Sequence, residues 1–521
     1  MDIKHTLGSK SSRAFHVKHP ASNSALRVWH RVWTVLLVLG LALGAAGCTT
    51  GINPVSGNTR AYGYSWEEEK RLGKQADEQI VKQYGVYDNE EVQQYVDRIA
   101  RDILEESHMR RPDTPEQFRN TEFTFRVLDS PVVNAFALPG GYVYVTRGLM
   151  SHLNNEAQLA VVLGHEIAHV AARHASQQAA KQQFAQLGLI AGAIGGELAG
   201  VSAGNILQLG SQATQLLFLK YSRDNERESD RLGVEYAAMN GYEVSEAAGF
   251  FESLKRIQQQ SNQALPTWQS SHPDPGAREQ TMRQLAQDWR QRLQQPLDKI
   301  EQNAYYAALD GVVLGQNPRQ GFARNDMFYH PDLEFQFPVP PSFQVINQPT
   351  QVALVEEEQN AIIQFRIAEE DTPRAAASQI TGADGVTVVD QGTMRAGSLT
   401  GYFVEADFQT EQGQTIRLLN FNVEYDGRIY SFLGYARKAD FSTYRDRFLR
   451  TMRNFAPLND PDILNIQPTR IGIQRVSQAA AFEAFLPATL PDDLPPDRMA
   501  ILNQVQLNQQ IDPGRSLKLP R

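Results

Sequence analysis

The residues best suited to chemistry in this sequence are His165, Glu166 and His169, within the run His-Glu-Ile-Ala-His. Two histidines four residues apart lie on one face of a helix, so both imidazoles can bind one ion with the glutamate beside it. Zinc suits such ligands, because it lowers the pKa of bound water towards ~7 and the glutamate can pass a proton to a departing amine. The run therefore predicts a zinc site for amide hydrolysis.

The neighbours of this run favour a buried site over the alternative of two surface histidines on an amphipathic helix. Residues 160–163 and Val170 are apolar, so the helix is expected to lie inside the fold. Buried polar groups without partners cost roughly a few kcal/mol, and a metal ion supplies the partner.

A catalytic zinc needs a third protein ligand and an open position. Ala172 and Ala175 stand where a glycine and a third histidine would complete the longer metzincin motif, which excludes that version. A carboxylate from a second helix is the alternative. Glu226 can bind the ion while Asp230, one turn later, accepts a hydrogen bond from the far nitrogen of a histidine ligand. Glu228 lies on another side of that helix. For the segment 225–230 as a whole, the alternative interpretation is a charged helix face exposed to solvent.

Helices must bring these residues together. The spacing of apolar residues predicts helices over residues 65–104, 155–180 and 216–239. Ser65, followed by acidic residues, is the expected N-cap of the first.

Short strands are expected at residues 123–127, where apolar and polar residues alternate, and at residues 141–145 after a Pro-Gly turn. The glycine-rich apolar segment 188–210 is expected to form a packed pair of short helices or a loop. A hairpin that dips into a membrane is the alternative for it.

Beyond about residue 310 the pattern changes to alternating strands, which indicates a separate α+β domain with an antiparallel sheet. Its strands are expected at residues 333–337, 361–367, 401–408, 416–425 and 429–436, with a closing helix at 441–455. The predicted order of parts is a signal peptide (1–47), a lipid-anchored linker (48–64), the zinc domain (65–300), the α+β domain (310–457) and a small C-terminal module (468–521).

The N-terminus predicts export. Basic residues precede the apolar run 32–47, whose sixteen residues fall short of a bilayer span and end at Cys48. A cysteine after such a site resembles a bacterial lipobox, in which the thiol receives diacylglycerol. An uncleaved membrane anchor is the alternative. Both interpretations place the residues after Cys48 outside the cytoplasm. Thr49 is not the aspartate typical of inner-membrane retention, so the outer membrane is the expected destination.

Composition narrows the function. The chain has 521 residues, 41% hydrophobic and 21% charged, with a net charge of −9 and no concentrated basic run, which argues against nucleic acid as a partner. Its single cysteine excludes disulfides within the chain and cysteine metal sites.

Several motifs in this order resemble metallopeptidase family forty-eight, which includes HtpX, the periplasmic BepA-type proteases and the CAAX prenyl endopeptidases. They lie within roughly residues 50–290 and are Asn134-Ala135-Phe136-Ala137-Leu138-Pro139-Gly140-Gly141, Gly148-Leu149, the run from His165 to His169, and Tyr221-Ser222-Arg223 before Glu226 and Asp230. The resemblance implies a mainly helical gluzincin fold with a small sheet. It also implies one zinc per chain held by His165, His169 and Glu226, with Glu166 as general base.

The resemblance further implies that one strand receives the substrate as an added antiparallel strand, which backbone pairing permits for many sequences. The residues of that strand are Gly141, Tyr142, Val143, Tyr144 and Val145. His272 and Arg278 would donate hydrogen bonds to the oxyanion of the tetrahedral intermediate, or His272 would cap the zinc at rest. His174 is expected to be structural. The tail at residues 502–503 and 511–520 resembles the end of a LysM module, without its usual Gly-Asp-Thr.

The expected function is a zinc-dependent endopeptidase of the bacterial periplasm that cuts misfolded or stalled envelope proteins. Expected partners are those substrates, outer-membrane lipid through Cys48, and peptidoglycan or the outer-membrane assembly machinery. One alternative is a lipoprotein chaperone or scaffold with an inactive or capped metal site. Another is an intramembrane or prenyl-type protease that uses residues 188–210 as a membrane element.

Overall fold

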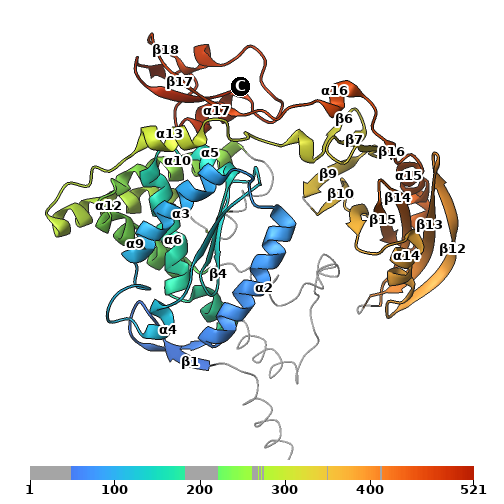
Figure 1. Ribbon diagram of the computed structural model, residues 1–521, viewed down its shortest axis with the longest axis horizontal. Helices are drawn as coiled ribbons and strands as arrows, with labels where there is room; N and C mark the ends of the chain where they lie inside the picture. The colour runs from blue at the N-terminus through green and yellow to red at the C-terminus, as the bar shows by residue number, and fades with distance from the viewer. Residues whose placement is uncertain are drawn as a thin grey trace, which may run out of the picture. The chain divides into compact units, whose positions relative to one another are not determined.

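The computed structural model describes residues 49–181, 221–260, 268, 272, 275–348, 350–410 and 413–521. The expected signal peptide, Cys48 and the segment 188–210 lie outside the described residues. The chain is a mixture of helices and several sheets, as the α+β prediction requires (Figure 1). None of the described helices has both the length and the apolar composition that crossing a bilayer demands.

The predicted helix over residues 65–104 is two helices, α2 (Trp66–Tyr84) and α3 (Glu90–Glu105). Ser65 caps α2 through a reciprocal capping box with Glu68, as expected. Gly85 ends α2 with φ of 67°, a conformation that suits glycine. The break lets α2 and α3 pack against different faces of the sheet that follows.

That sheet has three strands, β3 (Thr124–Leu128), β4 (Ala135–Leu138) and β5 (Tyr142–Thr146), in the order β3-β5-β4. The strand β5 pairs with β3 in parallel and with β4 in antiparallel. Both of its edges are therefore occupied.

The prediction that Gly141, Tyr142, Val143, Tyr144 and Val145 receive a substrate strand is therefore wrong, because a central strand has no free N–H or C=O groups to offer. Among the residues that the structure describes, the neighbour of β5 that forms an edge of the sheet on the side of α6 is β4, a strand that the sequence did not reveal.

Helices α6 (Glu156–Ala171) and α9 (Arg223–Met239) pack side by side, and α6 also borders β4 (Figure 1). They approach closely where Gly164 meets Gly233: a Cβ at position 233 would lie 2.6 Å from the backbone nitrogen of His165. Helix α6 ends earlier than predicted, because Arg173 adopts φ of 58° before residues 174–181 turn helical again.

One hydrophobic core joins α3, α6, α9 and the sheet to the C-terminal residues of the chain. Lys518 is fully buried there, and its Nζ donates to the carbonyls of Ser151 and Leu153, 2.5 and 2.7 Å away, just before α6. The other elements around this core are α4 (Glu116–Arg119), α5 (Arg147–His152), α10 (Ala247–Gln260), α12 (Pro275–Leu293), α13 (Gln302–Leu309), α17 (Pro496–Leu502), β17 (Ile471–Arg475) and β20 (Ser516–Pro520).

A second core lies within residues 328–455. Its antiparallel sheet has seven strands in the order β12-β13-β14-β15-β11-β10-β9. Four of the five predicted strands and the predicted helix are found here, whereas the strand predicted at residues 333–337 belongs to a separate, smaller sheet. The bounds of its elements are β9 (Phe343–Gln348), β10 (Gln351–Glu356), β11 (Ala361–Ala368), α14 (Pro373–Thr381), β12 (Val386–Ala396), β13 (Leu399–Gln409), β14 (Thr415–Tyr425), β15 (Arg428–Arg437) and α15 (Phe441–Arg453). A smaller sheet comprises β6 (Phe322–Arg324), β7 (Met327–His330), β8 (Phe335–Pro338) and β16 (Ala456–Pro457).

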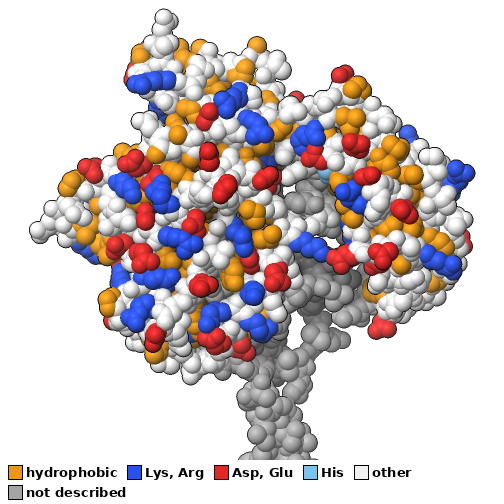
Figure 2. Space-filling model, in the orientation of Figure 1, with side chains coloured by type: hydrophobic (Ala, Val, Ile, Leu, Met, Phe, Trp, Pro, Cys, Tyr) orange, Lys and Arg blue, Asp and Glu red, His pale blue; other side chains and the backbone are white. Residues whose placement is uncertain are grey.

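Short elements complete the described chain. They are β1 (Thr49–Ile52), β2 (Thr59–Tyr62), β18 (Ala480–Ala481), β19 (Gln510–Ile511), α16 (Pro461–Leu464) and the single turns Val244–Glu246, Pro318–Gln320 and Phe482–Phe485. On the face drawn in Figure 2, described side chains of both charges are interspersed and form no large patch of one sign.

Candidate metal centre

Helix α6 carries His165, Glu166 and His169 into the interior. Asn155 caps the helix by accepting from the backbone N–H of Gln158, and every residue of α6 is buried. The apolar neighbours that predict burial thus place two imidazoles and a carboxylate where water is scarce, so each of these groups needs a specific partner.

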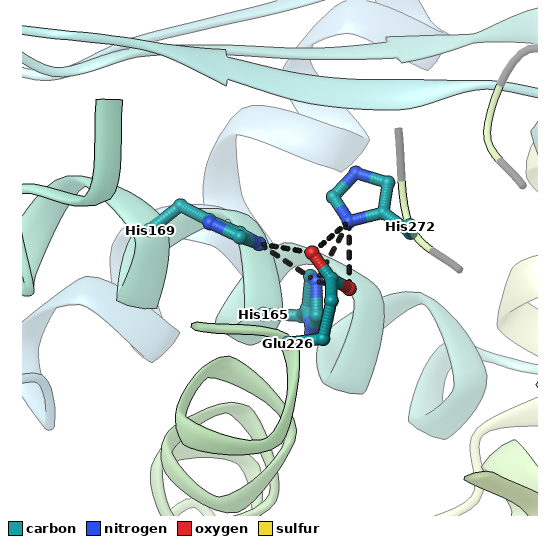
Figure 3. A group of neighbouring side chains, drawn as sticks. All are labelled: His165, His169, Glu226 and His272. Carbon is teal, nitrogen blue, oxygen red and sulfur yellow. Dashed lines mark hydrogen bonds and ion pairs between the residues drawn. The ribbon is translucent and has the colours of Figure 1, made fainter. Parts of the chain in front are cut away.

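Four side chains converge at this point: His165, His169, Glu226 and His272 (Figure 3). One possible ligand atom from each lies within 4.8 Å of the others, and all four residues are buried. Nε2 of His165 lies 3.0 Å from Nε2 of His169, and each of these nitrogens lies 3.5 Å from a carboxylate oxygen of Glu226. The two helices therefore meet as the sequence interpretation requires.

The spacing fits a tetrahedral ion. Bonds of about 2.0–2.1 Å to zinc at tetrahedral angles put ligand atoms about 3.3 Å apart. The 3.0 Å between the two imidazole nitrogens, and the 3.5 Å from His165 to Oε2 and from His169 to Oε1 of Glu226, lie on either side of that value. Two imidazoles and a carboxylate are also a common ligand set of catalytic zinc.

Glu166 lies beside this cluster without a partner of its own. Both of its carboxylate oxygens are buried and accept no hydrogen bond from the described residues. Nε2 of His272 lies 3.7 Å from Oε1 of Glu166. Burial raises the pKa of the Glu166 carboxyl, against the opposing influence of the nearby histidines. A buried carboxylate with open lone pairs and a raised pKa can accept a proton from a water molecule.

The cluster favours an ionised Glu226. Burial by itself would raise the pKa of this carboxyl, but the imidazoles of His272 and His165 hold it well below its usual range. Burial lowers the pKa of His169 well below the usual value, so its imidazole is neutral at pH 7. A carboxylate and a neutral imidazole are the forms that bind a metal ion.

Asp230 and Arg278 surround the far side of His165. Nδ1 of His165 lies 3.0 Å from Oδ1 of Asp230, the contact expected one turn after Glu226. The guanidinium of Arg278 bonds to Asp230 and reaches Glu226 Oε2 at 3.4 Å, and it stacks over Phe251 and Trp268 at 4.6 Å. Its terminal nitrogens thus contact two carboxylates of α9, those of Glu226 and Asp230.

His272 reaches the cluster from outside both helices. Its Nδ1 lies 3.0 Å from each oxygen of Glu226 and 3.2 Å from Nε2 of His165, and its ring stacks on Trp268. A third imidazole is therefore placed where it can act as a fourth ligand.

Two residues near His169 were missed as parts of the site. His174, expected to be structural, places Nδ1 3.1 Å from Nδ1 of His169, and its Nε2 lies 3.1 Å from Oε2 of Glu228. Glu228 does face away from the cluster, as predicted, but it meets His174 there. The extra histidine five residues after His169 was the available signal.

The strand β4 borders α6 and is an edge of its sheet among the described residues. Thr146 donates its N–H to the carbonyl of Asn134 at 3.0 Å, so alternate residues of β4 bond to β5 while Ala135 and Ala137 direct their backbone groups outward. The buried Oδ1 of Asn134 also has no partner among the described residues.

Comparison with known proteins agrees with this geometry. Residues 88–286 match the family described as Peptidase family M48. Metalloendopeptidase OMA1 of Bos taurus is 35% identical over 30% of this chain and 31% of its own length. The putative beta-barrel assembly-enhancing protease of Vibrio cholerae is 28% identical over 43% of this chain and 46% of its own length. The corresponding protease of Escherichia coli is 27% identical over 30% of this chain and 33% of its own length.

The chain thus matches between about a third and a half of the length of these relatives. The matching segment contains α3, the sheet, α6 and α9, which are the elements that assemble the cluster. This chain carries a metallopeptidase domain of family M48.

Proposed function

We propose that this protein is a zinc-dependent endopeptidase in which His165, His169 and Glu226 hold the ion and Glu166 is the general base. The observation that carries the proposal is a buried cluster in which two imidazole nitrogens lie 3.0 Å apart and each lies 3.5 Å from one oxygen of the Glu226 carboxylate, beside the buried Glu166 carboxylate that has no partner among the described residues. The names of the relatives, metalloendopeptidase and protease, support it.

A bound zinc ion would supply Lewis-acid activation of a water molecule and of the scissile carbonyl. Glu166 accepts the proton of that water at its open carboxylate oxygens and delivers it to the leaving amine nitrogen. Nδ1 of His165 lies 3.0 Å from Oδ1 of Asp230 and 3.1 Å from a terminal nitrogen of Arg278, and a hydrogen bond from Nδ1 to Asp230 would keep the lone pair of that ring on Nε2. The role of Arg278 as an oxyanion donor remains a prediction, while its contacts favour holding Glu226 and Asp230 in place.

The substrate strand is proposed to add to β4 rather than to β5. The outward N–H and C=O groups of Ala135 and Ala137 can pair with an extended peptide, and the Oδ1 of Asn134 can accept from it. Backbone pairing tolerates many sequences, so this mode suits a protease that cuts unfolded segments.

His272 is proposed to cap the site at rest. Its Nδ1 approaches both Glu226 and His165 at ligand–ligand distances, so it would take the coordination position that water needs. The same observation favours the alternative function, a chaperone or scaffold with a permanently capped site. Reversible capping would give a latent enzyme.

The setting is proposed to be the bacterial periplasm, with the protein held by lipid on Cys48 at the outer membrane. The basic and apolar N-terminal sequence before Cys48 supports this, and so does the similarity to proteases named for beta-barrel assembly. Misfolded or stalled envelope proteins are the proposed substrates. Peptidoglycan or assembly machinery would be further partners.

The decisive experiment measures zinc content and cleavage of casein by the full-length protein and by Glu166→Gln. The proposal expects about one zinc per chain in both proteins and cleavage by the parent alone, since the amide cannot accept the proton. Equal cleavage by both proteins, or a parent that binds no zinc, would refute the enzyme. Zinc without cleavage by the parent would favour the scaffold.

A further inference from the structure

His174 and Glu228 take no part in the mechanism above. His174 has no exposed surface, and its two ring nitrogens contact His169 Nδ1 and Glu228 Oε2, each at 3.1 Å. The contacts therefore run in series from His169, a proposed zinc ligand, through His174 to Glu228 on α9.

Only one arrangement of protons satisfies every contact in this line. Because His169 offers the lone pair of Nε2 to the ion, its neutral ring carries the proton on Nδ1. That N–H must donate to Nδ1 of His174, which is then an acceptor. His174 therefore carries its own proton on Nε2 and donates it to Glu228, whose carboxylate can only accept.

The opposite tautomer of His174 would fail at both ends. Two N–H groups would face each other across 3.1 Å at His169, and a lone pair would face the carboxylate oxygen of Glu228. The hydroxyl of Ser229 also reaches Nδ1 of His174, but at the longer distance of 3.3 Å. Glu228 is thus the group that selects the tautomer of His174.

The backbone explains how His174 arrives there. Arg173 adopts φ of 58° and turns the chain at the end of α6. Its guanidinium is fixed by Glu69, which Nε of Arg173 contacts at 2.9 Å, and by the ring of Tyr62 at 3.6 Å. The turn brings His174 beside α9 on the side where Glu228 projects.

We propose that His174 and Glu228 are positioning residues of the metal centre that fix the tautomer and ring orientation of His169. This inference rests on the proposed zinc site. Helix α9 then supplies the third ligand, Glu226, and the carboxylates that orient both histidine ligands, Asp230 for His165 and Glu228 for His169. Outer partners of this kind typically set metal affinity by ~10–100-fold.

Two matched substitutions test the role. In His174→Asn the amide oxygen stands close to the place of Nδ1 and can still accept from His169. In His174→Gln the longer amide reaches towards Glu228 and leaves that acceptor position empty. The readouts are zinc affinity, by competition with a chelator, and the visible spectrum of the cobalt-substituted full-length protein. Thermal unfolding of the metal-free protein serves as the control for a merely structural role.

The proposal expects His174→Asn to keep zinc affinity near that of the parent, whereas His174→Gln and Glu228→Ala weaken it by ~10–100-fold and alter the cobalt spectrum. Ser229→Ala, which removes the longer contact to the same nitrogen, should leave affinity unchanged.

The positioning role would be overturned if all variants bound zinc with equal affinity. It would also be overturned if His174→Gln kept the zinc affinity of the parent while His174→Asn lost it. A parent protein that binds no zinc would instead refute the proposed function. Should the His174 variants not fold, Glu228→Ala decides the matter, because the Glu228 side chain is 22% exposed and its loss leaves no large cavity.

Discussion

Nδ1 of His272 lies 3.0 Å from both carboxylate oxygens of Glu226, so the fourth ligand position of the proposed zinc site is within reach of a side chain of the protein itself. The other three possible ligands come from α6 and α9, which pack directly on each other. His272 comes from outside those helices and can be released without separating them.

Replacing His272 by alanine is therefore expected to raise the rate of casein cleavage. If the capped form holds about 90% of the molecules, removal of the cap increases the competent fraction about tenfold. The measurement is kcat/KM on labelled casein together with zinc content, which should stay near one per chain. The double variant with Glu166→Gln must be inactive. Unchanged zinc with lower cleavage would instead assign His272 to the oxyanion.

The pH dependence of cleavage should report Glu166. A general base must be deprotonated, so activity is lost as the pH falls through its pKa. Burial raises that pKa, so the acid side of the kcat/KM profile should lie above 4.5, the ordinary value for glutamate. If the acid limb of the kcat/KM profile lay at or below pH 4.5, the Glu166 carboxyl would have to be exposed to water in the active enzyme.

The site depends on how closely α6 and α9 approach, which Gly164 and Gly233 permit. A Cβ at position 233 would lie 2.6 Å from the backbone nitrogen of His165, where nothing flexible can move aside. Gly233→Ala should push Glu226 away from the histidines and cost about 1–3 kcal/mol of stability.

The corresponding measurements are thermal unfolding of the metal-free protein and zinc affinity, both of which should fall. Arg227→Ala, at a side chain that is 67% exposed on the same helix, is the matched control and should change neither. Normal zinc affinity in Gly233→Ala would mean that the helices can separate without opening the site.

Local patterns were enough to predict α6, its buried histidines and the meeting with Glu226, because helical spacing fixes which side chains share a face. The break at Gly85 and the turn at Arg173 were missed. The turn at Arg173 depends on Glu69 and Tyr62, which lie about a hundred residues earlier in the chain. Contacts of that range leave no periodic signal, and the role of His174 depends on them.

The strand β4 was missed for a different reason. Both of its faces are covered: Ala135 and Ala137 belong to the core with α6, while Phe136 and Leu138 pack with α2. Its four residues therefore show no alternation of polar and apolar side chains, which is the usual sequence signal of a half-buried strand. The order of the strands could therefore not be predicted from the sequence, and β5 was predicted to be the substrate strand in place of β4.

The assignment of β4 as the substrate edge leads to a test by proline. The N–H of Ala137 points away from β5, so Ala137→Pro removes a donor to the substrate while leaving the ladder to β5 intact. KM for an unfolded substrate should rise, with zinc affinity unchanged.

Phe136→Pro is the matched control one residue away, since the N–H of Phe136 faces Tyr144 of β5 and the ring of Phe136 stacks on that tyrosine at 4.7 Å. That variant should lose thermal stability, because proline removes a ladder hydrogen bond and a buried ring contact. If Ala137→Pro bound substrate as well as the parent did, the peptide would have to pair elsewhere. If it unfolded as Phe136→Pro does, the outward direction of its N–H would be wrong.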